Sequence, residues 1–200
     1  MKRDNHYEVA FEAFLRKRGV ATLPIVEARR SYLDDAEIKS PDFLVVGPAS
    51  TRYVVDVKGR VFPGRGVRSH KVWENWSPRS DVEGLTRWAA RFGAGFRGVL
   101  AFVYHILPEV ELMATPDLFE FRNRLYLVRG VNVVDYRAAM RPRSPRWGTV
   151  HLTKDAFQSV VKPFSYFLST RSPHPPTPSP EGRGGAGFTP PLPSGEGVGG

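Results

Sequence analysis

The feature that most constrains the fold of this chain is the segment 39–60, KSPDFLVVGPASTRYVVDVKGR. Two short runs of β-branched and aromatic residues, 43–46 and 53–57, flank a Gly-Pro-Ala-Ser-Thr stretch with the composition of a turn. Such runs on either side of turn residues predict a β-hairpin. A hairpin that is symmetric about the middle of this turn places Leu44 opposite Val54.

Three charged residues interrupt these apolar runs, namely Asp42, Asp56 and Lys58. Side chains alternate between the two faces of a strand, so Asp56 and Lys58 project from the same face. With Ala49 at the centre of the turn, Asp42 lies opposite Asp56, and directly paired Cβ atoms are roughly 4.5–5.5 Å apart. Carboxylates this close repel, so that one takes up a proton or a cation lies between them. A divalent metal ion is the simplest candidate.

Composition limits the class of protein. The 200 residues are 41% hydrophobic and include no cysteine, which favours one domain without disulfides or thiolate metal sites. The net charge is +9, and residues 172–200 hold one Arg and two Glu, so the first 171 residues carry 28 basic and 18 acidic groups. This surplus favours a polyanionic partner, although a solubilising surface is the alternative. The charged start of the chain and the lack of a long apolar run predict a cytoplasmic protein without a membrane partner.

Asn5 or Asp4 is predicted to cap a helix that runs to about Arg18, with Gly19 ending it. Its apolar residues recur at i, i+4, i+7 and i+8 and form one stripe: Tyr7, Phe11, Phe14 and Leu15. Glu8 lies at the edge of this stripe, whereas Glu12 lies about 40° closer to solvent. Glu8 is thus better placed to point inwards, and ordinary surface positions for both glutamates are the alternative.

The loop after the hairpin is rich in glycine and in cations. Its basic residues are candidates to bind phosphates: Arg60, Arg65, Arg68 and Lys71. Trp73 and Trp76 follow; they either stack on bases or hold the loop against the core, and the second role is favoured.

Beyond the loop, the pattern S-x-x-E at 80–83 predicts a capping box for a helix that ends at Gly93. Residues 98–106 form a nearly continuous apolar run, typical of a strand covered on both faces. We expect further strands near 119–128 and 131–134 and a final helix that starts at Thr153 or Asp155.

Two later segments have unusual composition. Residues 141–147 contain three arginines and a tryptophan, which suits either a nucleic-acid contact or a structural corner packed on the sheet. In residues 172–200, 16 of 29 residues are Pro or Gly, which predicts disorder. The expected organisation is therefore a single domain over 1–168, with a core at about 5–106 and a β-rich extension at 107–168, followed by a disordered tail at 169–200.

The acids and the lysine of the hairpin suit a specific chemistry. Mg²⁺ prefers one or two carboxylates and keeps several waters, which leaves positions for phosphate oxygens. Such an ion activates a water and neutralises charge in the transition state, and a nearby lysine stabilises the same charge. Motifs of the competing kinds of site, such as GxSxG and HExxH, do not occur in the sequence.

Pro41-Asp42, thirteen further residues and then Asp56-Val57-Lys58 resemble the PD-(D/E)xK signature of the restriction-endonuclease-like nuclease superfamily, in particular its Holliday-junction-resolvase-like members. The resemblance covers about residues 5–106. The segment HYEVAFE at 6–12 is also similar to an uncharacterised bacterial group with an HYExAFE motif.

The resemblance implies an α/β fold with a restriction-endonuclease-like core, in which helices flank a central mixed β-sheet. It selects Glu8 over Glu12 and implies that Glu8, Asp42 and Asp56 hold Mg²⁺ or Mn²⁺ while Lys58 attends the attacking water. The expected function is a metal-dependent endonuclease that acts on nucleic acid, with DNA as the expected substrate. Resolvase-like enzymes are commonly dimers, so the resemblance is also compatible with a homodimer.

Two alternatives remain open at this point. One is a nucleic-acid-binding module on a nuclease fold without catalysis. The other is a structural cluster of salt bridges that involves Lys58 and neighbouring arginines.

Overall fold

The structure is a computed structural model of the whole chain. It describes residues 5–25, 31–33, 36–47, 51–63 and 73–169. The predicted disorder of the tail and three of the loop cations, Arg65, Arg68 and Lys71, lie outside these residues.

The helices are α1 (His6–Lys17), α2 (Arg79–Phe92), α3 (Val133–Ala139), α4 (Lys154–Val160), α5 (Ser165–Leu168) and the 3₁₀ turn η2 (Pro145–Trp147). The strands are β1 (Ala21–Pro24), β2 (Ser31–Leu33), β3 (Ala36–Ile38), β4 (Phe43–Val46), β5 (Arg52–Phe62), β6 (Ser77–Pro78), β7 (Phe96–Ile106), β8 (Leu118–Phe121), β9 (Arg124–Asn132), β10 (Arg141–Ser144), β11 (Thr149–His151) and β12 (Lys162–Pro163).

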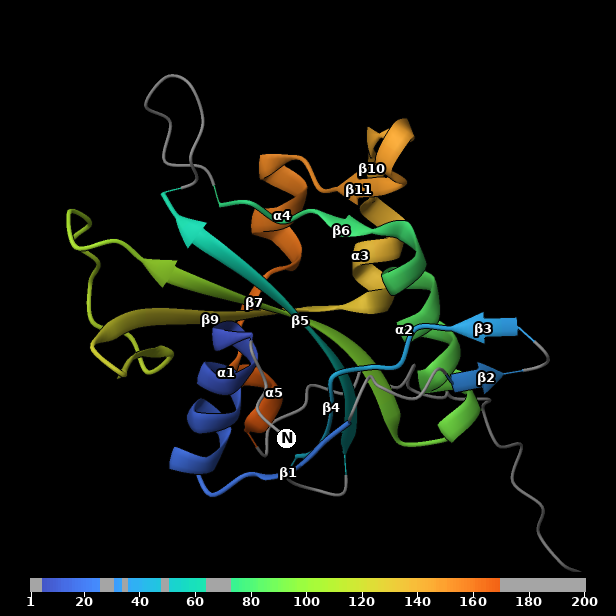
Figure 1. Cartoon of the computed structure of the whole chain (residues 1–200), viewed down its shortest axis with the longest axis horizontal. Helices are drawn as coiled ribbons and strands as arrows, with labels where there is room; N and C mark the ends of the chain where they lie inside the picture. Colours follow the sequence, from blue (N-terminus) through green and yellow to red (C-terminus); the bar gives the residue numbers. More distant parts are fainter. Residues whose placement is uncertain (1–4, 26–30, 34–35, 48–50, 64–72, 170–200) are drawn as a thin grey trace, which may run out of the picture.

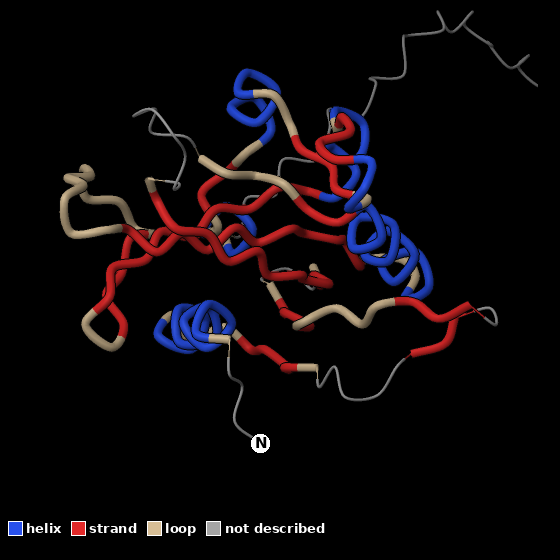
Figure 2. Tube along the Cα trace, turned by 45° about the horizontal axis from the view of Figure 1, so that its top comes forward, coloured by secondary structure: helices blue, strands red, loops and turns tan. Residues whose placement is uncertain are grey.

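A seven-stranded sheet forms the centre of the described chain, in the order β1-β4-β5-β7-β9-β12, with β8 paired to β9. Strands β5 and β7 run parallel over their full lengths, and the other pairs of this sheet are antiparallel. Helices lie on both sides of the sheet (Figures 1 and 2). The expected α/β fold with a central mixed sheet flanked by helices is therefore confirmed.

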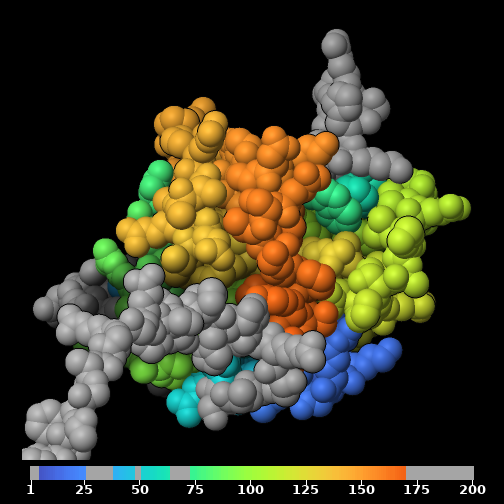
Figure 3. Space-filling model, turned by 180° about the vertical axis from the view of Figure 1, so that it is seen from behind, coloured from blue at the N-terminus to red at the C-terminus, as the bar shows by residue number. Residues whose placement is uncertain are grey.

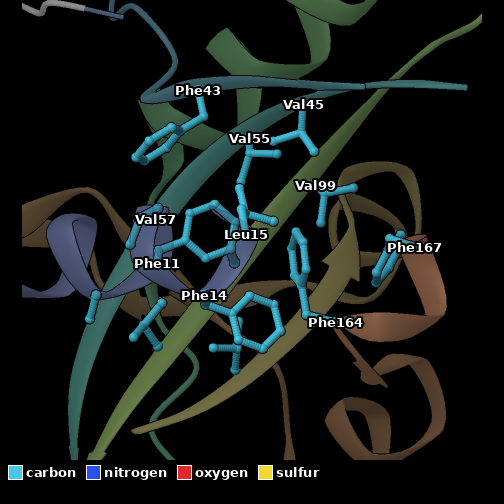
Figure 4. Close-up of a cluster of buried hydrophobic side chains, with 14 of the residues drawn as sticks. Phe11, Phe14, Leu15, Phe43, Val45, Val55, Val57, Val99, Phe164 and Phe167 are labelled. Carbon is cyan, nitrogen blue, oxygen red and sulfur yellow. The ribbon is translucent and has the colours of Figure 1, made fainter. Parts of the chain in front are cut away.

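One face of the sheet is covered by α1 and α5. Asn5 caps α1 by accepting a hydrogen bond from the Tyr7 amide, and Gly19 follows the helix with φ of +66°. These two residues begin and end the helix as the sequence predicts. The predicted apolar stripe of α1 packs with β5, β7 and α5 in one buried cluster (Figure 4).

The other face is covered by α2, α3 and α4, around a second apolar cluster. Successive residues of β5 alternate between the two clusters, because Val55 and Val57 belong to the first cluster and Val54 and Phe62 to the second. By the same alternation, Asp56 and Lys58 face the α2 side of the sheet. Their position is the starting point of the candidate site.

Two smaller sheets accompany the central one. Strands β2 and β3 pair with each other. Strands β10, β11 and β6 form a three-stranded sheet, in which β6 leads directly into α2. Figure 1 shows the three-stranded sheet at one end of α2.

Residues 107–168, expected to form a β-rich extension, contribute the strands β8 to β12. Strand β9 pairs along β7, and Phe164 and Phe167 belong to the α1-side cluster, so residues 107–168 complete the central domain. The segment also contains α3, α4 and α5, and is thus mixed. The sequence pattern missed this because the short helices alternate with strands over few residues.

Several predicted boundaries also differ. The run 119–128 is divided between β8 and β9, because Arg122 and Asn123 adopt positive φ angles of 50° and 58° and turn the chain. The predicted strand at 131–134 is the end of β9 followed by α3, which Asn132 caps by accepting from the Val134 amide. Thr153 does cap α4, as one of the two predicted starts.

The capping box predicted at 80–83 does not form. Helix α2 starts at Arg79, its N-cap residue is Pro78, and no side chain caps it among the described residues. The Ser80 hydroxyl donates to Asp81 instead. Within the described part of the chain, no helix is both long enough and apolar enough to cross a membrane.

Candidate active site

The hairpin of β4 and β5 has the predicted register. Leu44 pairs with Val54 and Phe43 with Val55, so the antiparallel ladder runs towards Asp42 on one strand and Asp56 on the other. The Asp42 amide, one residue before β4, donates to the Val55 carbonyl at 2.9 Å. The two aspartates therefore approach each other at the end of the paired region, on the α2 side of the sheet.

Asp42 is a buried carboxyl group in an environment that disfavours its charge. Its Oδ2 accepts a hydrogen bond of 2.6 Å from the Val57 amide. Burial raises the pKa of Asp42 to about 7; the Asp56 carboxylate adds to the rise, while the Val57 hydrogen bond and the Lys39 ammonium oppose it. At neutral pH this carboxyl group is thus poised between its protonated and ionised forms.

Asp56 and Lys58 form an ion pair on one face of β5, two residues apart as predicted. Both side chains are buried, with exposed fractions of 4% and 7%. The Lys58 Nζ also donates to Asp81 Oδ2 at 2.5 Å. Lys58 therefore lies between one carboxylate of the central strand and one at the start of α2.

Lys39 joins the same group from the segment before β4. Its Nζ lies 3.2 Å from Asp56 Oδ1 and 3.2 Å from Asp81 Oδ2. Burial opposes the charged form of Lys39, but the carboxylates of Asp56, Asp81 and Asp42 outweigh it and raise the pKa of Lys39. Two ammonium groups and three carboxyl groups thus meet at this end of the hairpin.

Asp81, like Lys39, is a residue of this group that sequence analysis missed. Burial opposes ionisation of Asp81, but the ammonium groups of Lys58 and Lys39 prevail and lower its pKa. Its neighbours Ser80 and Glu83 were interpreted as a capping box, which assigned the first turn of α2 a purely local role. The available signal was Asp81 itself, an acid in the first turn of a predicted helix. The sequence does not show, however, that this turn packs against Lys58 of β5.

Glu8 lies on α1, which covers the opposite face of the sheet from Asp56 and Lys58. Its Oε1 accepts a hydrogen bond of 2.7 Å from Asn5 Nδ2. The Glu8 charge is close enough to add to the rise in the pKa of Asp42, although it is the smallest of the causes. Among the described residues, no three His, Cys, Asp or Glu side chains are arranged to hold a metal ion. Joint metal binding by Glu8, Asp42 and Asp56 stays a prediction.

Arg60 occupies a different position from that expected of a residue that binds phosphates. Its guanidinium lies 3.9 Å from the centre of the Trp76 ring and donates to the Trp76 carbonyl. Its side chain is only 10% exposed. A side chain that binds a phosphate must be accessible, whereas Arg60 is held against Trp76 inside the α2-side layer.

Trp73 holds the end of the loop against the core, as favoured from the sequence. Its ring stacks on Phe62 with centroids 3.6 Å apart and meets Tyr104 edge-on at 4.8 Å. Base stacking by Trp73 would require this packing to open. The loop cations Arg65, Arg68 and Lys71 lie outside the described residues and stay predictions.

The donor set at the hairpin fits a hard divalent cation. Asp56 Oδ2 is buried and accepts no hydrogen bond from the described residues, although it forms the ion pair with Lys58. Asp42 is a second oxygen donor whose ionised form is penalised by burial and by Asp56. A divalent cation between these carboxylates would remove that penalty, and Mg²⁺ requires no more than one or two carboxylates from a protein.

No protein-family model matches the chain, and no curated protein matches it. Among solved structures, the chain is similar to a Holliday junction resolvase, Hjc, of Archaeoglobus fulgidus. The two share 15% sequence identity with a TM-score of 0.46, over 80% of this chain and 90% of that chain. A likeness of this degree establishes no family membership, so the function is inferred from the residues of the site.

Proposed function

We propose that the protein is a metal-dependent endonuclease that hydrolyses phosphodiester bonds of nucleic acid, with DNA as the expected substrate, on a restriction-endonuclease-like fold. The observation that carries the proposal is geometric: two buried aspartates on facing strands meet beside a buried lysine. The surplus of 28 basic over 18 acidic groups in residues 1–171 favours a polyanionic substrate.

Asp42 and Asp56 are the residues that would hold Mg²⁺ or Mn²⁺. The bound ion would supply charge neutralisation at the phosphate and a lowered pKa for the attacking water. Glu8 adds negative potential at Asp42 from the side of α1, and its role as a third ligand stays part of the proposal. The resemblance to the HYExAFE group also stays a prediction.

Lys58 is the group that would act on the reacting phosphate. Asp81 accepts a hydrogen bond from the Lys58 ammonium on the α2 side. Lys58 therefore keeps an acidic partner when the Asp56 carboxylate binds a metal ion. In the proposal, Lys58 orients the attacking water and stabilises the negative charge that develops on the phosphate oxygens. Asp81 acts through Lys58 as a positioning residue.

The test is a cleavage assay with the purified full chain. Linear duplex, branched and single-stranded DNA are each incubated with Mg²⁺, with Mn²⁺ and with EDTA. We expect cleavage that requires the metal and that is lost in Asp56→Ala and in Lys58→Ala. Asp135→Asn, which removes an exposed carboxylate in the first turn of α3, is the matched control. Cleavage that survives both site substitutions would refute the assigned site.

The ion pairs favour one other candidate role, a structural salt-bridge cluster. Asp56 and Asp81 are each within 3.2 Å of Lys39, and each also pairs with Lys58. A buried network of this kind can serve specificity of folding alone. This role predicts that the protein binds neither Mg²⁺ nor Mn²⁺, which calorimetry measures directly.

A further inference from the structure

The segment from β10 to β11 carries an exposed aromatic ring among exposed arginines. Trp147, at the end of η2, is 72% exposed, although large aromatic side chains are on average highly buried. The arginines around it are exposed as well: Arg141, Arg143 and Arg146. Of the two roles that the sequence allowed for residues 141–147, a corner packed on the sheet is therefore wrong for the Trp147 ring.

The cations of this segment lie close together and are not neutralised within it. Among the described residues, none of the ion pairs to a carboxylate involves Arg141, Arg143 or Arg146. Burial lowers the pKa of His151, and the charges of Arg143 and Arg141 lower it further, which shows that both charges act on the neighbouring strand. Three cations that pair with no carboxylate among the described residues, two on β10 and one on η2, create a site of positive potential.

The backbone holds Trp147 in a fixed place. Pro145 begins the 3₁₀ turn, and Gly148 ends it with φ of +55°, in the left-handed region that glycine adopts readily. The Gly148 carbonyl accepts a hydrogen bond of 2.8 Å from the Arg79 amide, the first residue of α2. The ring is thus exposed on an ordered turn, which limits the entropy lost when a ligand packs on it.

The same hydrogen bond connects this surface to the candidate active site. Arg79 lies two residues before Asp81, and Asp81 accepts the hydrogen bond from Lys58. A second connection passes through Trp76, because the guanidinium groups of Arg60 and Arg143 lie 3.9 Å and 4.9 Å from its ring centre. The start of α2 therefore contacts both the exposed segment and the hairpin.

We propose that Trp147, with Arg141, Arg143 and Arg146, forms a platform that binds an unpaired segment of the nucleic-acid substrate, with a base stacked on Trp147 and phosphates on the arginines. Every base has a π-face, so an exposed indole accepts single strands of any sequence, and arginines bind phosphates next to it. Bases within a duplex are already stacked, so a rigid exposed indole favours a strand with unpaired bases. In Figure 3 the gold and orange atoms, which cover the part of the chain around residues 133–160, adjoin one another on this face of the molecule.

This inference rests on the proposed function for its substrate, but its test does not require cleavage. The probes are a fluorescein-labelled single-stranded oligothymidylate and a labelled duplex of the same length, both in EDTA. Binding to the full chain is followed by fluorescence anisotropy over a range of salt concentrations. The wild type should bind the single strand, and Trp147→Ala should lose roughly 5- to 150-fold in affinity for it, as expected for one stacked base.

Conservative and charge variants separate stacking from folding. Trp147→Phe keeps an aromatic face and should recover most of the affinity. Arg146→Gln should lower the dependence of log affinity on log salt by about 0.7, the value for one phosphate contact on a single strand. The matched controls are Met113→Ala, which removes another highly exposed apolar side chain, and Arg87→Gln on the exposed side of α2. Both controls should bind as the wild type does.

The outcomes distinguish the platform from the nuclease. Wild-type-like binding by Trp147→Ala, or a wild type that does not bind the single strand, would overturn the platform even if metal-dependent cleavage requires Asp56. Conversely, selective loss of single-strand binding in Trp147→Ala supports the platform even if cleavage is never observed, and the protein would then be a binding module.

Discussion

The two faces of strand β5 differ in chemistry although they share one backbone. Towards α1, Tyr53, Val55 and Val57 join a cluster built of apolar side chains. Towards α2, the same strand places Asp56, Lys58 and Arg60 among apolar neighbours. Buried charges are costly even when they are paired, whereas buried apolar groups stabilise in proportion to their area. Towards α1, strand β5 therefore contributes only to the stability of the fold, whereas towards α2 it also carries buried charges at some cost in stability.

The largest effect should come from the α1 face. Phe11 is fully buried and packs edge-on against Phe43 and Phe164, with ring centroids 5.3 and 4.9 Å away. Phe11→Ala should lower the free energy of unfolding by about 3–5 kcal/mol, because it removes apolar contacts and leaves a cavity. Urea denaturation followed by circular dichroism measures this change. A loss below 1 kcal/mol would show that the α1 face is not the stabilising layer.

A change at Asp42 should have the opposite sign. The raised pKa, about 7 in the folded protein, means that the folded state holds a proton that the unfolded chain releases near pH 4. Stability from this group is therefore lost as pH rises from about 4 to 7, and the penalty is complete above pH 7. Asp42→Asn removes the penalty and should stabilise the metal-free protein at pH 8 by on the order of 2 kcal/mol.

At pH 4 the same substitution should have little effect, since Asp42 is then protonated in both states. Denaturation of the two proteins in EDTA at a series of pH values measures the difference. A difference between them that does not change with pH would contradict a protonated, charge-penalised Asp42.

A change at Asp81, which acts through Lys58, should affect catalysis. Asp81→Asn removes one charged acceptor of the Lys58 ammonium but leaves the pair with Asp56. A hydrogen bond to a charged group contributes about 1.5–3 kcal/mol, so we expect a fall in kcat of roughly tenfold or more, with KM nearly unchanged. Glu83→Gln, an exposed carboxylate on the same helix, is the matched control. Equal effects of the two substitutions on kcat would contradict a positioning role for Asp81.

The sequence predicted those parts of the molecule that depend on local pattern. The register of Leu44 with Val54, the cap at Asn5 and the end of α1 near Gly19 all follow from neighbouring residues. The parts that it missed depend on contacts between distant segments. Asp81 and Lys39 reach Asp56 only because α2 and the segment before β4 pack at the same end of β5.

Long-range packing also explains the two other differences. Arg60 was expected at a phosphate, but the Trp76 ring, brought in by the path from the loop to β6, covers its guanidinium. Strand β9 was assigned to an extension, but its pairing with β7 places it inside the central sheet. In each case the local pattern was correct for a strand or a cation, and the partner was set by the tertiary fold.

The central claim is that Asp42 and Asp56 together bind a divalent cation, and calorimetric titration of Mn²⁺ tests it most directly. The titrations compare the full-length wild type with Asp42→Asn, Asp56→Asn and the control Asp135→Asn at pH 8, where Asp42 is ionised. The proposed site predicts binding in the wild type and in Asp135→Asn, and loss of binding in both hairpin variants. A wild type that binds no Mn²⁺, or an Asp42→Asn protein that binds it equally well, would contradict the claim and leave the structural salt-bridge cluster as the role of these charges.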